Sequence, residues 1–228
     1  MPFWNDVSFR RFLDEHPHLN GLRQYLPSDL KTKLFPQQID IEKLWTSYKE
    51  HGYGYFFYAL TRLLNPRSCV EIGVLQGFSL LTVASALEHN GLGQIEGFDL
   101  FEHYPYHNEN MKNVIERIEG AGLQRWARVS RLDAFDAERN FDSVDYLHVD
   151  ISNHGDIYRR MFGQWAGKVK KVMLFEGGSA QRDRVEWMIK FEKPSIVEAL
   201  EEIRRNYPEW SISVLDPFPS LTVAVRRP

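Results

Sequence analysis

The sequence predicts an α/β fold: a doubly wound, mostly parallel seven-stranded sheet with a terminal antiparallel strand pair and a helical N-terminal arm. Three observations predict it. From Pro66 onward, short apolar runs alternate with segments whose apolar residues recur at helical spacing. This alternation is typical of parallel strands joined by crossover helices. The last two apolar runs have only a loop between them, so they should pair antiparallel. The first 52 residues, in contrast, have weak periodicity and are interrupted by prolines.

The individual elements follow from the same patterns. Helical stripes interrupt the strands, and the last one begins at Pro194-Ser195, a typical helix start. Parallel strands are predicted at 69–72, 95–98, 127–130, 144–149 and 169–175. Helices are predicted at 79–87, 111–118, 157–165 and 196–207, and the antiparallel strands at 212–214 and 221–225. We therefore expect residues 1–52 to form an arm or cap and residues 53–228 to form one Rossmann-like domain.

Composition excludes several classes of protein. The formal net charge is -3 and no long basic run occurs, which gives no reason to expect nucleic acid or an acidic membrane as a partner. No apolar stretch approaches the roughly 20 residues that span a bilayer. A single cysteine, Cys69, fits a reducing compartment, and the first residues show no signal-peptide pattern. We expect a cytoplasmic enzyme.

The residues that bear on chemistry lie at the predicted carboxyl ends of strands, where doubly wound sheets bind ligands. Gly73 and Gly77 follow the first strand and open the next helix. Glycine lets the backbone approach a ligand closely, and a helix N-terminus offers free N–H groups. Asp99 ends the second strand, where an acidic residue can accept hydrogen bonds from both hydroxyls of a ribose.

Two features distinguish this turn from a dinucleotide-binding turn. Its glycines read G-x-x-x-G and not G-x-G-x-x-G, so a pyrophosphate loop is poorly specified. Glu71 also places a carboxylate beside the turn, where it would repel a pyrophosphate but attract a cationic sulfonium ligand. A nicotinamide-dependent oxidoreductase on the same sheet is therefore the less favoured alternative.

The segment Glu71-x-Gly73-x-x-x-Gly77 resembles the first motif of class I S-adenosylmethionine (SAM)-dependent methyltransferases. The resemblance covers about residues 53–228 and includes the terminal antiparallel strands. It implies that SAM is the cofactor and that the motif residues contact it, with Ser79 at the helix start as a further candidate. Other positions resemble further motifs of the family: Asp99 the ribose-binding acid, Leu132-Asp133-Ala134 the adenine-contacting segment, and His148-Val149-Asp150 the catalytic edge.

Each of these residues could instead have a purely structural role. Glu71 could be a salt-bridged residue at a strand end, and Asp99 could cap a helix. Asp133 could form a turn or lie in solvent. Ser79 could only start its helix.

The resemblance implies methyl transfer to an oxygen, or with less support a nitrogen, of a small-molecule acceptor. The enzyme's work would be to position the nucleophile and to remove its proton. Asp150, His154 and Glu176 are the candidate catalytic residues. The aromatic arm and the loop 103–107 would cover the acceptor, and the arm could instead form a homodimer contact. A non-catalytic SAM-binding protein is a third alternative, since a fold does not fix a function.

A divalent metal is possible but not favoured. The metal-dependent methyltransferases that this chain resembles carry an Asp after the fourth strand and two adjacent acidic or amide residues after the fifth. Such oxygen ligands suit Mg²⁺. Asp150 and Glu176 match, but Gly177 stands where the third ligand is expected, and Asn153 or Asp156 would have to replace it. We therefore favour direct base catalysis by Asp150 or His154.

Overall fold

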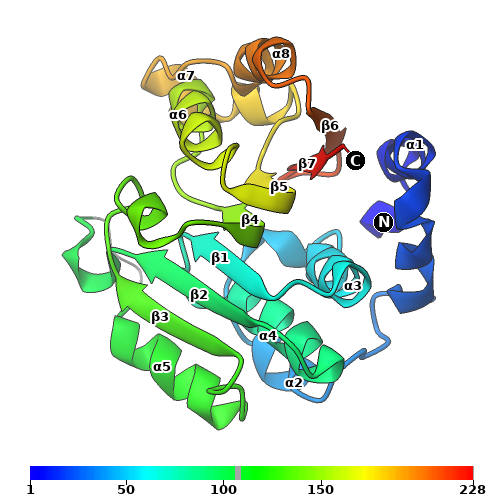
Figure 1. Cartoon of the computed structure of the whole chain (residues 1–228), viewed down its shortest axis with the longest axis vertical. Coiled ribbons are helices and arrows are strands. Elements are labelled where there is room, and N and C mark those ends of the chain that lie inside the picture. Colours follow the sequence, from blue (N-terminus) through cyan, green and yellow to red (C-terminus); the bar gives the residue numbers. More distant parts are fainter. Residues whose placement is uncertain (106–108, 228) are drawn as a thin grey trace.

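The computed structural model describes residues 1–105 and 109–227, and a single seven-stranded sheet forms its centre (Figure 1). The strand order is β3-β2-β1-β4-β5-β7-β6. Strands β1 to β5 pair in parallel, whereas β7 runs antiparallel to both of its neighbours. The strands are β1 (Ser68–Ile72), β2 (Gln94–Asp99), β3 (Ala127–Arg131), β4 (Val144–Val149), β5 (Val169–Glu176), β6 (Trp210–Leu215) and β7 (Leu221–Arg226). The predicted fold class is confirmed.

The helices that join the strands lie close to their predicted positions. The longer helices are α1 (Val7–Glu15), α3 (Tyr53–Leu64), α4 (Phe78–Asn90), α5 (Met111–Gly120), α6 (Gly155–Trp165) and α8 (Ile196–Asn206). The 3-10 helix η2 (Pro17–Tyr25) has nine residues, like α1. Helices α2 (Gln38–Ile41) and α7 (Glu186–Lys190) are short, as are the 3-10 helices η1 (Phe3–Asn5), η3 (Ser47–Lys49), η4 (Phe101–His103), η5 (Ala137–Asn140) and η6 (Arg182–Arg184). The patterns did not predict α7 or the individual 3-10 segments, because one or two turns carry too few residues to show a helical stripe.

Two apolar layers cover the two faces of the sheet. One contains the arm, α3, α4 and α5, and the other contains α6, α7 and α8. Successive side chains of a strand point to opposite faces, so Cys69 joins the first layer and Val70 joins the second. Both layers reach the strands that carry the candidate site, and these strands are therefore rigid supports.

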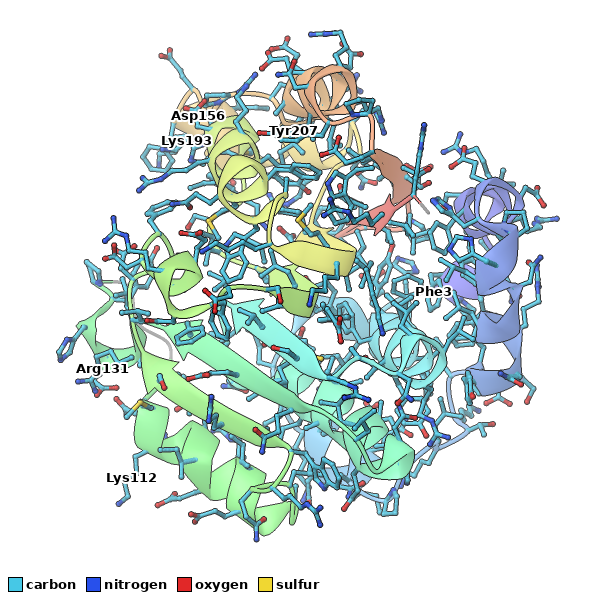
Figure 2. All side chains as sticks on the ribbon, in the orientation of Figure 1. Phe3, Lys112, Arg131, Asp156, Lys193 and Tyr207 are labelled. Carbon is cyan, nitrogen blue, oxygen red and sulfur yellow. The ribbon has the colours of Figure 1, made fainter. Side chains whose placement is uncertain are left out.

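The N-terminal arm packs into the first layer and supplies no strand among the residues described. Phe3, labelled in Figure 2, stacks on Tyr53 of α3 with ring centroids 5.4 Å apart. Phe9 and Phe12 of α1 are fully buried. The Ser213 hydroxyl of β6 donates a hydrogen bond of 2.6 Å to the Glu15 carboxylate. The arm is thus bound to the sheet edge and to α3, and a homodimer contact stays a prediction.

The strand order also fixes where a ligand should bind. The chain runs outward from β1 to β2 and β3, and then returns to place β4 on the other side of β1. The order reverses between β1 and β4, and doubly wound sheets bind ligands outside the carboxyl ends of the strands at this point. Among the helices in the described part of the chain, none is long and apolar enough to cross a membrane.

Candidate functional site

A cavity of about 390 Å³ opens at the carboxyl ends of β1, β2 and β4. Its size suits a small organic ligand, since such pockets measure roughly 300–1,000 Å³. Its wall combines apolar and acidic side chains with two turns of backbone. The lining residues are Gly73, Leu75, Phe98, Asp99, Leu100, Phe101, Tyr104, Glu109, Leu132, Asp133, Ala134, Phe135, Asp150, Ile151, Ser152, His154 and Ile157. Six of the ten residues predicted for the site therefore meet in one cavity: Gly73, Asp99, Asp133, Ala134, Asp150 and His154.

Gly73 follows β1 directly and lies against the backbone of Asp150, which follows β4. Its N–H donates a 2.8 Å hydrogen bond to the carbonyl of Phe98, and its φ is +88°. A Cβ at this position would lie 2.0 Å from the carbonyl oxygen of Asp150. No side chain fits there, so glycine allows the turn after β1 to pack against the backbone of Asp150. Gly77 has φ +87° as the N-cap of α4 and lies outside the cavity wall.

The Asp99 carboxylate holds the turns on both sides of the cavity. One oxygen accepts hydrogen bonds from the N–H groups of Val74, at 2.8 Å, and Leu75, at 3.1 Å. The other accepts from the N–H of Phe101 at 2.9 Å. A carboxylate has about four acceptor sites, so Asp99 retains capacity for a ligand hydroxyl.

Asp133 and Ala134 lie at the opposite wall, after β3. The Asp133 carboxylate accepts a hydrogen bond of 2.9 Å from the N–H of Phe135, so it does form the turn that its residue type suggests. The turn also lines the cavity with apolar surface from Leu132 and Phe135. The structural role of Asp133 and a ligand contact are therefore compatible.

Two of the predicted cofactor residues, Glu71 and Ser79, lie behind the cavity and not in its wall. Glu71 is fully buried on the α3 and α4 side of the sheet. The Ser79 hydroxyl donates a 3.0 Å hydrogen bond to one Glu71 oxygen, and the other oxygen pairs with His148 Nδ1 at 3.2 Å. The structural alternative for Glu71, a salt-bridged strand-end residue, describes its position.

His148 links this pair to the arm. Its Nε2 lies 3.2 Å from the hydroxyl of Tyr48 in η3, and both side chains are buried. Asp150, two residues after His148, lines the cavity. Burial raises the pKa of Asp150, while His148, Tyr48 and Arg182 act in the lowering direction. Residues from the arm, β1 and β4 thus form one polar chain behind the cavity.

His154 reaches the cavity from the N-terminus of α6. Burial lowers its pKa, with a further lowering by the charge of Lys193, and Asp156 acts against them. Both charged residues are labelled in Figure 2. The Nδ1 of His154 is buried and has no hydrogen-bond partner in the described structure. Burial therefore favours the neutral imidazole of His154, which lines the cavity.

Glu176 ends β5 and is engaged by Arg182. Arg182 Nε donates to Oε1 at 3.0 Å and Nη2 donates to Oε2 at 3.0 Å, a bidentate pair that is almost fully buried. Burial and the neighbouring Asp150 charge raise the pKa of Glu176 to about 7, against the effect of Arg182. Glu176 does not line the cavity, which separates it from the other two catalytic candidates.

The oxygen ligands predicted for a metal do not assemble. Both Glu176 oxygens bind the Arg182 guanidinium, and Gly177 offers no side chain. Asn153 directs its amide nitrogen to the carbonyls of Val149 and Glu176, at 3.1 and 3.0 Å. Within the residues described, no group of three or more His, Cys, Asp or Glu side chains is arranged to hold an ion. Both Glu176 oxygens are thus engaged by Arg182, whereas Asn153 Oδ1 is buried with no hydrogen-bond partner in the described structure.

Tyr48, Glu109 and Arg182 were not predicted from the sequence. Tyr48 and Arg182 lie in single-turn 3-10 helices, and no motif marks them. Glu109 pairs with Arg117 at 2.6 Å. Burial acts to raise its pKa, but hydrogen bonds from Asn110, Asn113 and Arg117 outweigh it and lower the pKa.

Of the loop predicted to cover the acceptor, Tyr104 lines the cavity, whereas Tyr106 and His107 lie outside the described residues.

The charge of the cavity wall is strongly one-sided. Asp99, Glu109, Asp133 and Asp150 contribute carboxyl groups, and the described lining residues include neither lysine nor arginine. Carboxylates at low dielectric attract a cation and repel phosphate groups. The wall therefore favours a positively charged ligand over a dinucleotide.

Comparisons with known proteins agree with this geometry. Residues 70–173 match the family described as Methyltransferase domain. No curated protein sequence matches the chain. The O-methyltransferase TomG from Streptomyces achromogenes, solved with SAM and involved in tomaymycin synthesis, is similar in structure: TM-score 0.62, 17% identity, 98% of this chain and 96% of that chain. The methyltransferase PaMTH1 from Podospora anserina, bound to S-adenosylhomocysteine, has a TM-score of 0.61 and 14% identity, and the comparison covers 100% of this chain and 98% of that chain. An O-methyltransferase from Bacillus cereus, in complex with S-adenosylhomocysteine, has a TM-score of 0.57 and 16% identity, and the comparison covers 99% of this chain and 100% of that chain. At these identities the structural likeness shows a shared fold.

Proposed function

We propose that the chain is a class I SAM-dependent methyltransferase that transfers a methyl group from SAM to an oxygen of a small-molecule acceptor; the match of residues 70–173 to the methyltransferase domain family supports this. The acidic cavity wall is the observation that carries this proposal. Four carboxyl groups and no described lysine or arginine suit a sulfonium, whereas the phosphates of a dinucleotide would be repelled. The solved O-methyltransferases of the same fold support oxygen as the acceptor atom.

The cavity offers each part of SAM a suitable surface. The remaining acceptor capacity of Asp99 is available to the ribose hydroxyls. The apolar side chains of Leu100, Leu132 and Phe135 would pack against the adenine ring. Gly73 and Asp150 both line the cavity, and the amino-acid end would lie beside them.

The chain's own contribution to the reaction is positioning and proton removal. When bound, SAM supplies an electrophilic methyl group whose bond to sulfur breaks as the bond to the acceptor oxygen forms. His154 lines the cavity and can take the acceptor proton, because its lowered pKa favours the neutral imidazole at physiological pH. Asp150 is the alternative base, and its carboxylate also favours positive charge in the cavity. Glu176 would act only indirectly, as the partner of Arg182.

Calorimetric titration with SAM, S-adenosylhomocysteine and NAD tests the proposed function. SAM and S-adenosylhomocysteine should bind and NAD should not. Asp99→Ala should weaken SAM binding roughly tenfold or more, since a hydrogen bond to a charged group contributes about 1.5–3 kcal/mol. Release of S-adenosylhomocysteine in the presence of a panel of hydroxylated small molecules then tests turnover. Binding of NAD without SAM would establish the oxidoreductase alternative, and SAM binding without turnover on any acceptor would favour a non-catalytic SAM-binding protein.

A further inference from the structure

Glu109 is held in the cavity wall by three hydrogen-bond donors. The residue is 8% exposed and lines the cavity just before α5 begins. Its Oε1 accepts hydrogen bonds from the N–H of Asn110, at 2.9 Å, and from the side-chain amide of Asn113, at 2.6 Å. Its Oε2 pairs with Arg117 Nη2 at 2.6 Å. Burying a carboxylate is costly unless such partners satisfy it, and here they fix the side chain before any ligand enters.

Arg117 of α5 makes a second contact through its other terminal nitrogen. Nη1 donates a 3.3 Å hydrogen bond to the carbonyl of Gln76, 41 residues away in the sequence. Gln76 belongs to the turn between β1 and α4, which contributes Gly73 and Leu75 to the cavity wall. One guanidinium therefore joins two parts of the wall that come from separate segments of the chain. The planar fork of arginine suits two acceptors at once, whereas the ammonium of lysine is a compact point charge.

The turn after β1 also has supports on other elements. The Asp99 carboxylate of β2 accepts hydrogen bonds from the N–H groups of Val74 and Leu75. The side-chain oxygen of Gln76 accepts a 2.7 Å hydrogen bond from the N–H of Trp45 in the arm. Arg117 adds a link to α5, so that β2, the arm and α5 all bind the same turn.

We infer that Arg117 is a positioning residue of the cofactor cavity: it ties the Glu109 carboxylate to the turn after β1 and so fixes two parts of the wall relative to each other before the ligand binds. The inference rests on the proposed function for the identity of the ligand, since SAM in this cavity would contact both parts. A site whose walls are already in place loses less free energy to ordering when the ligand enters. Arg117 is not among the residues that line the cavity, so it would act on the ligand through Glu109 and the turn.

Amide hydrogen exchange in the ligand-free protein measures this tie directly. In Arg117→Gln, the N–H groups of Val74 and Leu75 should exchange roughly tenfold faster or more, because the turn opens more easily once hydrogen bonds from a charged group are lost. Arg128→Gln is the matched control, since Arg128 pairs with Glu96 at the same 2.6 Å and neither residue lines the cavity. Unchanged exchange in Arg117→Gln, or an equal increase in the control, would overturn the inference.

Arg117→Lys separates the tie from the charge. Lysine keeps a positive charge beside Glu109 but lacks the fork, so this variant should bind the ligand almost as weakly as Arg117→Gln. By calorimetry, both variants should bind SAM and S-adenosylhomocysteine roughly tenfold more weakly, and Arg128→Gln should match the wild type. Wild-type affinity in Arg117→Lys would mean that charge alone matters. A loss for SAM but not for S-adenosylhomocysteine would mean that Glu109 acts on the sulfonium charge. Either result contradicts the inference.

Glu109→Gln completes a double-mutant cycle with Arg117→Gln. Both substitutions break the same tie, so their losses of SAM affinity should be less than additive. Fully additive losses would mean that the two residues act independently and would contradict the inference. Thermal melts verify that each variant is folded, and Arg117→Lys takes the exchange test if Arg117→Gln is not. Failure of the wild type to bind either ligand contradicts the proposed function instead, and hydrogen exchange in the ligand-free protein still decides on Arg117.

Discussion

At the scale of single residues, Gly73 should tolerate substitution least. An alanine Cβ would collide with the Asp150 carbonyl at 2.0 Å and would also have to adopt φ +88°. Gly73→Ala should therefore destabilise the protein by several kcal/mol and abolish SAM binding, because β1 and β4 would have to separate at the cavity floor. Denaturant unfolding and calorimetry measure the two effects.

Gly91→Ala separates the collision from the backbone strain. Gly91 has a positive φ of +67°, but an added Cβ there meets nothing within 4 Å. Its substitution should cost only about 1–2 kcal/mol, the penalty of the left-handed conformation, and should leave SAM binding intact. Equal losses in the two variants would mean that strain alone, and not the close approach to Asp150, explains Gly73.

His154 carries the prediction about pH. Its pKa is lowered below the usual 6.5, mainly by burial, so the neutral form that can accept a proton persists to lower pH than for an exposed histidine. Turnover should accordingly stay high below pH 6.5 and decrease only at more acidic pH. His154→Gln should reduce turnover by about 10²-fold or more while SAM affinity changes little. Unchanged turnover in this variant would assign proton removal to Asp150.

At the scale of elements, the strand ends show how far the sequence could predict the site. Residues at the carboxyl ends of β1, β2 and β4 were predicted because the sheet topology brings strand ends together wherever the strands lie in the sequence. Gly73, Asp99 and Asp150 do line one cavity. Glu71, two residues before Gly73, does not line this cavity, and its buried carboxylate contacts Ser79 and His148.

The residues missed by sequence reasoning lie on elements that leave no pattern. Tyr48 and Arg182 belong to three-residue 3-10 helices, and their partners are 100 and 6 residues away in the sequence. Neither periodicity nor turn chemistry encodes such contacts. They depend on how the arm and the segment after β5 pack, which only the tertiary structure reveals.

The end of β5 carries the prediction about metal. Because the Arg182 guanidinium holds both Glu176 oxygens, we propose that catalysis uses direct proton removal without a divalent ion. EDTA should leave turnover unchanged, and Mn²⁺ should show no stoichiometric binding by electron paramagnetic resonance. Arg182→Ala releases the Glu176 carboxylate next to Asp150 and is the variant in which metal affinity could arise. Loss of wild-type activity on chelation, restored by Mg²⁺, would establish metal dependence.

At the scale of the whole molecule, the arm and the sheet should unfold as one unit. Phe9 and Phe12 of α1 are fully buried in the same apolar layer as Phe56 and the first face of the sheet. Phe9 also contacts Phe3 and Phe56 edge to face, with ring centroids 5.1 and 6.5 Å apart. An arm that shares its core with the sheet has little stability of its own to lose separately.

Phe9→Ala tests this cooperativity. The substitution should lower the free energy of unfolding of the entire chain by about 3–5 kcal/mol, because it leaves a cavity in the shared layer. Val7→Ser on the same helix is the control: Val7 is 67% exposed, so its replacement should change stability by less than about 0.5 kcal/mol. Circular dichroism and the fluorescence of Trp165 and Trp210, buried on the far layer, should report a single coincident transition in every variant. If Phe9→Ala instead produces an early transition that leaves the far-layer fluorescence unchanged, residues 1–52 are a separable unit. The contact of Tyr48 with His148 would then have to form after the sheet has folded.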